Sequence, residues 1–210
     1  ERLQQVPVAV TAISGDDLAR QSIVTLSDLT TKIPAIQIMP TAFSANIPRF
    51  VVRAQSQLEP LFAQDPSVAV YFADVVQARA HGVNGAMYDL ASVQVLKGPQ
   101  GTLFGRNTTG GAVLLVPQKP TDSLEGYVEG SLGNFDMRRV EAVLNLPIAD
   151  SVRLRLGVDR QKRDGYMTND SGIGPRDFAD VNYFSARASL VVDLSPDIEN
   201  YTIGSFSRSN

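Results

Sequence analysis

The 210-residue sequence has no cysteine and only one histidine. The absence of cysteine excludes disulfides, thiolate metal sites and cysteine nucleophiles, although it does not identify a compartment. His81 has loop-forming neighbours, and the chain offers no ordered set of nucleophile, base and orienting group. The acidic stretch 169–180 lacks the ligand spacing of a calcium loop. We therefore expect no catalytic residue, no metal site and no cofactor.

The sequence also lacks a strong charge bias and a long apolar run. Its formal net charge of −3 is too mild to indicate a nucleic-acid-binding surface, so no nucleic acid is expected as a partner. No uncharged apolar stretch reaches the roughly 18 residues of a membrane helix. This excludes a helical membrane protein. It does not exclude a β-barrel, because alternating strands give only a weak hydropathy signal.

Residues 1 to about 120 have the pattern of a mixed α/β region. Ser14 before two aspartates predicts a helix start, and Thr25 with Asp28 three residues later predicts a second one, which Pro34 ends. Glycine- and proline-bearing loops separate short apolar runs. Strands are expected at 6–10, 36–39, 50–53, 68–76, 93–96 and 112–116.

From Leu124 onward the apolar residues recur with a period of two, and the residues between them include full charges. The alternation alone favours a soluble antiparallel sandwich over a membrane barrel. Two further features favour the barrel: strands close to the ~9–11 residues that a tilted membrane strand needs, and short turns that alternate with longer loops. Strands are expected at 126–133, 139–146, 152–159, 184–193 and 199–207, with connections at 134–136, 147–151, 164–180 and 195–197.

Residues 89–113 contain a short apolar strand, 93–96, that runs into a glycine-rich stretch. Glycine permits positive φ angles and close approach of other groups, and a glycine–proline pair forces a turn. The spacing is neither that of a phosphate loop nor that of a dinucleotide loop. The residues concerned are Gly98, Pro99, Gly101, Gly105, Gly110 and Gly111.

As a whole, this segment resembles the plug domain of TonB-dependent outer-membrane receptors. That family has a leucine–arginine–glycine–proline turn, then an aromatic–glycine pair, then a paired glycine before the last plug strand. The matching residues here are Leu96, Lys97, Gly98 and Pro99, then Phe104 and Gly105, then Gly110 and Gly111. Residues 118–121 resemble the passage from plug to barrel, and 126–135 resemble the first barrel strand with its hairpin. The resemblance therefore covers essentially the whole chain.

The resemblance implies an α+β plug domain in residues 1–120, followed in 121–210 by antiparallel transmembrane β-barrel strands. The barrel is expected to be incomplete in this chain, because five strands cannot close around a plug. The implied function is gated, active uptake of a scarce ligand across the outer membrane of a Gram-negative bacterium. That ligand would be an iron–siderophore-type chelate, cobalamin or a carbohydrate. The implied partners are outer-membrane lipid and the inner-membrane TonB complex.

In that family two plug arginines pair with barrel glutamates. Arg53 matches one of them, and Lys97 keeps the charge of the other but not its bidentate fork; either could instead be a solvated basic residue at a strand end. Two other departures are Ala54, where the family has glycine, and Ala73 followed by Asp74, where it has aspartate–glycine.

Ligand contacts in the family come from plug loops that face outward. The corresponding segments here are 41–46, 55–57 and 77–81, with candidate residues Gln55, Gln57, Gln77, Arg79 and His81. The alternative function is a non-transporting antiparallel β-domain, structural or adhesive and without enzymatic activity. A transporter needs many more alternating strands after residue 210, whereas such a domain does not.

Overall fold

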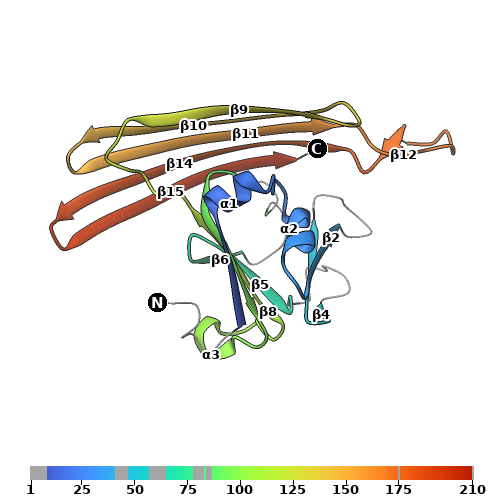
Figure 1. The fold of residues 1–210 in the computed structure, drawn as a ribbon, viewed down its shortest axis with the longest axis horizontal. Helices are drawn as coiled ribbons and strands as arrows, with labels where there is room; N and C mark the ends of the chain where they lie inside the picture. Colours follow the sequence, from blue (N-terminus) through green and yellow to red (C-terminus); the bar gives the residue numbers. More distant parts are fainter. Residues whose placement is uncertain are drawn as a thin grey trace. The chain divides into compact units, whose positions relative to one another are not determined.

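The chain forms two compact units, Glu1–Gln118 and Lys119–Asn210. The computed structural model describes residues 9–40, 47–56, 65–77, 83, 87–174 and 176–209. Figure 1 draws the first unit in blue to green and the second in yellow to red. Within these described ranges, no helix combines the length and the apolar character needed to cross a membrane.

The first unit contains two sheets and short helices. The larger sheet has five strands in the order β1-β7-β8-β5-β6, and the smaller has three in the order β2-β3-β4. All strand pairs are antiparallel except β5 with β8, which is parallel. The strands are β1 Ala9–Ser14, β2 Ile36–Pro40, β3 Pro48–Val52, β4 Gln55–Ser56, β5 Val68–Phe72, β6 Val75–Gln77, β7 Leu90–Lys97 and β8 Gly111–Pro117.

Two predicted helix starts are confirmed. α1 (Gly15–Arg20) begins after Ser14, whose hydroxyl accepts a hydrogen bond from the backbone N–H of Asp17 at 3.1 Å. A 3-10 turn, η2 (Leu26–Asp28), leads into α2 (Leu29–Lys32), and the Asp28 carboxylate accepts from the N–H of Thr25 at 2.8 Å. α2 ends just before Ile33, which is extended because Pro34 follows it. The fourth helical element is α3 (Gly101–Phe104).

The core of the first unit is apolar. Its helices contribute Leu29, and the central strands contribute Val93, Val95 and Val113, each with 0% of its surface exposed. These residues belong to one hydrophobic cluster that joins both sheets to the helices. Burial of apolar surface from water is thus the main force that holds this unit together.

Three strand predictions in the first unit are wrong in their bounds. The strand expected at 6–10 continues to Ser14 as β1, and residues 6–8 lie outside the described residues. The run 68–76 is two strands, because Ala73 and Asp74 (φ 50° and 64°) form a two-residue hairpin turn. β3 ends at Val52, because Arg53 and Ala54 (φ 49° and 65°) form the same kind of turn into β4. No glycine marks either turn in this sequence, so the apolar runs gave no sign of the break.

The second unit is an antiparallel sheet of five strands in the order β15-β14-β11-β10-β9, in which sequence neighbours pair. The strands are longer than expected. The predicted loop 164–180 contains a small two-stranded ribbon, β12 with β13. The bounds are β9 Glu125–Gly133, β10 Met137–Ala149, β11 Val152–Arg163, β12 Met167–Thr168, β13 Asp177–Phe178, β14 Val181–Ser195 and β15 Ile198–Ser209.

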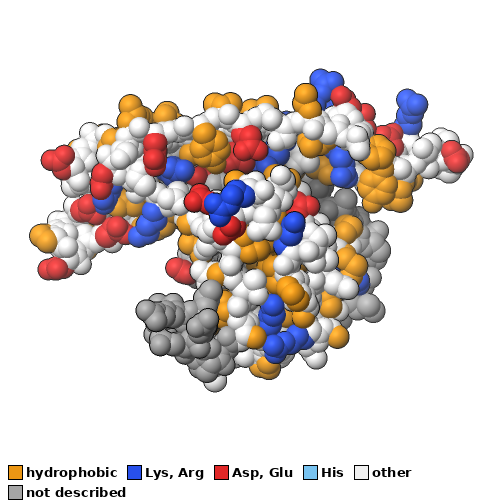
Figure 2. Space-filling view, viewed as in Figure 1, with side chains coloured by type: hydrophobic (Ala, Val, Ile, Leu, Met, Phe, Trp, Pro, Cys, Tyr) orange, Lys and Arg blue, Asp and Glu red, His pale blue; other side chains and the backbone are white. Residues whose placement is uncertain are grey.

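Along the middle of β10 and β11, the second unit buries polar residues of its alternation and exposes apolar ones. On β10, Val140 and Leu144 are 51% and 44% exposed, whereas Arg139, Glu141 and Asn145 are 4%, 8% and 0% exposed. Figure 2 shows hydrophobic side chains along the upper edge of this unit. A soluble sandwich packs its apolar faces against each other, so this arrangement is the reverse of the sandwich alternative.

Candidate functional site

The glycine-rich segment forms a closed loop between β7 and β8. The backbone N–H of Gly98 donates to the carbonyl of Gly110, and that of Gln100 donates to the carbonyl of Thr108, both at 2.9 Å. Inside the loop, the Thr108 hydroxyl donates to the carbonyl of Gly105 at 2.8 Å. Gln100 and Thr108 are 4% and 1% exposed, so the polar centre of the loop is itself buried and hydrogen-bonded.

The glycines of this loop are needed for different reasons. Gly111 has φ +150°, and a Cβ there would lie 2.3 Å from the carbonyl oxygen of Leu96. A Cβ on Gly110 would lie 2.7 Å from the Cβ of Gln55. Gly101 has open space within 4 Å of its Cβ position. The paired glycines therefore permit close packing against neighbouring strands, whereas Gly101 has no such role.

An aromatic contact ties α3 to the central sheet. The Tyr71 hydroxyl on β5 donates to the carbonyl of Phe104 at 3.0 Å, and the two rings lie 5.1 Å apart between centroids. No sequence pattern indicates this contact. Tyr71 and Phe104 are 33 residues apart, so only the fold brings them together.

The structure places Arg53, Gln55 and Lys97 at the same end of the first unit. One Nη of Arg53 is 3.1 Å from the position that a Cβ would take on Gly98, and Lys97 immediately precedes Gly98 at the end of β7. Gln55 packs beside Gly110. Within the described residues, neither Arg53 nor Lys97 forms an ion pair. Their pairing with barrel glutamates stays a prediction.

The remaining ligand-facing candidates are only partly described. Gln77 ends β6, where it is half-buried and pairs in register with Val70. It lies in a different sheet from Gln55, which is exposed on β4. Gln57, Arg79, His81 and the segment 41–46 lie outside the described residues. The structure therefore does not test this set as a group.

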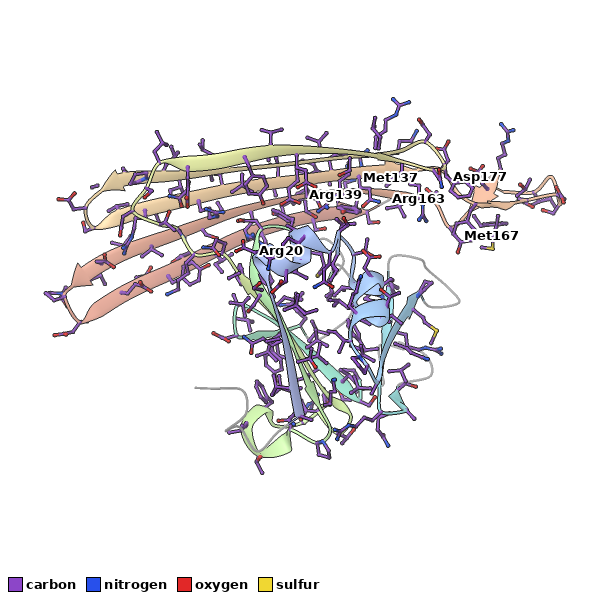
Figure 3. The ribbon with its side chains drawn as sticks, viewed as in Figure 1. Arg20, Met137, Arg139, Arg163, Met167 and Asp177 are labelled. Atoms are coloured by element: carbon purple, nitrogen blue, oxygen red, sulfur yellow. The ribbon has the colours of Figure 1, made fainter. Side chains whose placement is uncertain are left out.

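The second unit contains a buried ionic network on its polar face. Arg139 on β10 donates to both carboxylate oxygens of Asp159 on β11, at 2.8 and 3.2 Å, and to Glu141 at 2.8 Å. The Tyr183 hydroxyl on β14 donates to Asp159 at 2.8 Å and lies 3.1 Å from the side-chain oxygen of Gln161. Figure 3 labels Arg139 among the side chains of these strands. The network links three adjacent strands.

The strand register explains why Arg139 lies at the centre of this network. Glu129, Glu141 and Asp159 lie directly opposite one another on β9, β10 and β11. Like charges opposite one another destabilise a strand pair, and Arg139, two residues along β10 from Glu141, bonds to two of the three carboxylates. The alternation in the sequence predicts charges on one face of the strands, but it does not predict this set of partners, because their pairing depends on strand register.

Asn145 holds the segment before β9 in place through hydrogen bonds to Thr121 and Ser123. Its side chain is fully buried. Its amide donates to the carbonyls of Thr121 and Ser123 at 2.9 and 2.6 Å, and its oxygen accepts from the N–H of Thr121 at 3.0 Å. In the parts of the chain that the structure describes, no group of three or more His, Cys, Asp or Glu side chains is arranged to hold a metal ion.

Comparison with models of protein families shows the family of this chain. The family model for the TonB-dependent receptor plug domain matches residues 2–112, which is more than half of the 210 residues. The chain belongs to the TonB-dependent receptor family. The resemblance inferred from the sequence is therefore confirmed, and the protein is one of the outer membrane.

Named relatives of the receptor chain bind different molecules. The pesticin receptor of Yersinia enterocolitica is 28% identical over 201 residues, which cover 94% of this chain and 28% of the relative. The metal-pseudopaline receptor of Pseudomonas aeruginosa is 32% identical over 109 residues, which cover 50% of this chain and 14% of the relative. The chain thus spans less than a third of the length of these relatives.

Solved structures share the fold. The ferric yersiniabactin uptake receptor of Yersinia pestis matches with a TM-score of 0.81 and 26% identity, over 95% of this chain and 31% of that one. The ferripyoverdine receptor of Pseudomonas aeruginosa matches with a TM-score of 0.77 over 98% of this chain and 26% of that one, but at 18% identity it supports the fold alone. The predicted fold class is confirmed: a plug followed by antiparallel barrel strands that do not close within this chain. These relatives are receptors, not enzymes.

Proposed function

We propose that the full-length protein imports an iron–siderophore-type chelate through a barrel that its plug gates. Residues 1–120 act as the plug, and 121–210 form the first part of the barrel wall. The observation that carries this proposal is the inverted alternation of the second unit. Val140, Leu144, Leu156 and Val158 are exposed, whereas the charged residues Arg139, Glu141 and Asp159 on the other face are buried, as in a wall with lipid outside and a polar interior. The named relatives are receptors, which supports transport as the function of this wall.

The choice of ligand rests on the relatives. The ferric yersiniabactin and metal-pseudopaline receptors are both named for metal chelates. Cobalamin and carbohydrate find no counterpart among these names. Energy for opening comes, in this proposal, from the inner-membrane TonB complex.

The test is growth on a single iron source. A strain that lacks the full-length gene is grown on a panel of ferric siderophores, and on cobalamin or carbohydrates as separate sole sources. At least one ferric siderophore should support growth only when the gene and the TonB complex are both present. Dependence on cobalamin or a carbohydrate instead would reassign the ligand, and growth independent of both gene and TonB would refute uptake.

We also propose that Arg53 and Lys97 seat the plug against barrel glutamates. Arg53 is exposed in this chain, so the proposal requires the complete barrel to bury it beside its partner; loss of one partner from a charge pair buried in that way costs about 3–5 kcal/mol. Arg53→Ala in the full-length receptor should therefore admit bulky antibiotics while ligand affinity changes little. Arg106→Ala is the matched control, because Arg106 is another exposed arginine of the first unit, and its partner is Asp65 of the same unit at 3.1 Å. A large loss of affinity with unchanged permeability would instead make Arg53 a ligand contact.

The candidate ligand-facing residues are Gln55, Gln57, Gln77, Arg79 and His81. Their replacement by alanine should have the opposite effect to Arg53→Ala: weaker ligand binding with an intact permeability barrier. Titration of the purified receptor with the siderophore found above, alongside antibiotic sensitivity, separates the two roles. If the Gln55→Ala variant instead admits bulky antibiotics, Gln55 helps to hold the plug in place and is not a ligand contact. The packing of Gln55 beside Gly110 supports this alternative.

The orientation of the strands is proposed from the connections. Loop 164–180 and hairpin 134–136 face outside, whereas the turns at 147–151 and 195–197 are periplasmic, because successive antiparallel connections alternate sides. The chain has no native cysteine. In intact cells, an impermeant thiol reagent should label Ser171→Cys but not Asp150→Cys until the outer membrane is broken. Equal labelling of both would contradict a membrane-spanning sheet.

A further inference from the structure

Residues 119–124 join the two units, and they form neither helix nor strand. We call this segment the linker. It follows Gln118, the last residue of the first unit, and it ends at Glu125, where β9 begins. Because no strand pairing fixes its path, the linker depends on contacts with the second unit. Its residues bond to three other strands of that sheet, β10, β11 and β15.

Asn145 on β10 provides the central attachment of the linker. Its amide nitrogen donates to the carbonyls of Thr121 and Ser123, and its oxygen accepts from the N–H of Thr121, at distances of 2.6 to 3.0 Å. The side chain has 0% of its surface exposed, so these bonds form away from water, where a hydrogen bond is stronger. Alanine at this position would leave three backbone groups of the linker without this partner.

Two ion pairs attach the linker to other strands. The Lys119 ammonium is 2.6 Å from the carboxylate of Glu199 on β15. The Asp122 carboxylate accepts from Arg153 on β11 at 3.0 Å, and the same guanidinium bonds to Asp193 on β14 at 2.5 Å. The side chains of Lys119 and Asp122 are 55% and 80% exposed, so water and salt weaken both pairs. Asn145 should therefore hold the linker more firmly than either pair does.

The attachment points span the sheet of the second unit on one face. Asn145 lies directly opposite Glu125 on β9, at one edge of the sheet. Glu199 belongs to β15, at the other edge. Side chains alternate along each strand, and the register places Asn145, Arg153 and Glu199 on the same face as the ionic network. The linker therefore crosses this face before it continues into β9.

We propose that Asn145 is a positioning residue for the gate: it holds the linker against the barrel wall and makes Gln118 the last residue that leaves with the plug. This inference rests on the proposed function, in which the TonB complex opens the plug. β8 is the last strand before the linker. When β8 has been pulled free, the load reaches the three hydrogen bonds of Asn145 together. Without them residues 119–124 would extend as well, by about 20 Å at roughly 3.3–3.6 Å per residue.

The experiment applies force to the N-terminus of the full-length receptor in a lipid bilayer and records the extension of single molecules. Neither siderophore nor the TonB complex is present. After the plug has unravelled, the wild-type receptor should pause and then extend by a separate step of about 20 Å before the first barrel hairpin unfolds. A plug that unravels straight through to β9, with no separate step, would overturn the proposal. The wild-type record decides this even if a variant does not assemble.

Variants measured at constant force assign the pause to Asn145. Asn145→Ala should shorten the pause before this step at least about tenfold, because three hydrogen bonds are lost. The matched control is Asn200→Ala, which makes the same change at an exposed asparagine of β15 that accepts from the Thr202 hydroxyl at 2.9 Å. Its pause should match that of the wild type. An unchanged pause in Asn145→Ala, or an equal loss in the control, would contradict the assignment.

The linker itself supplies a second variant. Asp122→Asn changes an exposed side chain of the linker and alters no strand, so it should shorten the pause by only about two- to threefold. A larger effect than that of Asn145→Ala would make the ion pair with Arg153 the main attachment and overturn the role of Asn145. Because no ligand or TonB complex is used, a missing pause leaves the uptake proposal intact. Failure of siderophore-dependent growth likewise leaves the pause intact.

Discussion

The two units of the chain bury opposite kinds of side chain. In the first, the most deeply buried residues are apolar, as at Leu29 and Val113. In the second they include Asn145 and Asp159, with 0% and 1% of their surface exposed. Among the described residues, the first unit buries only Gln100 and Thr108 as polar side chains. The two halves of one chain are therefore stabilised in different ways.

The difference follows from what surrounds each unit. The hydrophobic effect requires water outside, and the first unit uses it to assemble strands and helices around one core. A strand whose outer face contacts lipid gains little from burying apolar groups, because lipid is equally apolar. The second unit instead relies on complete strand pairing and on polar contacts across its inner face. This comparison predicts which substitutions damage each unit.

The largest effect is expected from the ionic network. Asp159→Ala leaves Arg139 buried without its bidentate partner, which should cost about 3–5 kcal/mol of barrel stability. Denaturant unfolding of the full-length receptor, followed by its β-sheet signal, measures this. Asp164→Ala is the control, because that carboxylate is 52% exposed and 3.9 Å from its partner. Equal effects of the two would mean that the inner face is not a polar core.

The second-largest effect is expected from truncation of a buried leucine, and this effect should differ between the two units. Leu29→Ala should destabilise the plug by about 2–5 kcal/mol, because it leaves a cavity in a close-packed core. Leu132 on β9 is 85% exposed, and its truncation should have almost no effect on plug or barrel. Hydrogen exchange of the full-length receptor reports each region separately. Comparable losses of protection in both variants would contradict the distinction between a water-excluding core and a lipid-facing surface.

Backbone strain in the glycine-rich loop should give a smaller but localised effect. At Gly111, alanine has an unfavourable φ and its Cβ would clash with the carbonyl of Leu96, so Gly111→Ala should cost at least about 1–3 kcal/mol. Gly101→Ala has open space and should be nearly neutral. Thermal unfolding of the full-length receptor, with protease sensitivity of the plug as a second readout, compares the two. Equal tolerance would show that the loop packs more loosely than the structure indicates.

The smallest effect concerns pH. The Ser14 hydroxyl and the Arg20 guanidinium hold the pKa of Asp17 below its ordinary value. The carboxylate therefore stabilises α1 above its unfolded pKa of about 3.9, and this contribution disappears as the pH falls through the lower folded value. Protection of the α1 amides should thus decrease in acid in the receptor but not in Asp17→Asn. The same acid dependence in both would assign it to another group.

Local features of the fold could be predicted from the sequence, and long-range ones could not. The helix starts at Ser14 and Thr25 depend on hydrogen bonds within a few residues, so they were found. The turn at Ala73 and Asp74 was missed because neither residue is the glycine or asparagine that usually marks positive φ. In the site, the glycine segment was found as a motif. Its contact between Tyr71 and Phe104 required the fold.

The order of elements, the period of two after Leu124 and the glycine pattern follow from the sequence alone, because each depends on neighbouring residues. Only the tertiary structure decided which face of the alternating strands is buried. The alternating pattern of a strand is compatible with burial of its apolar face or of its polar face. The neighbouring strands and the solvent or lipid around the sheet determine which face is buried. The register of β10 against β11 places Glu141 opposite Asp159, and the turn between the strands sets that register. The face that carries these charges is the buried one, and there Arg139 bonds to both carboxylates.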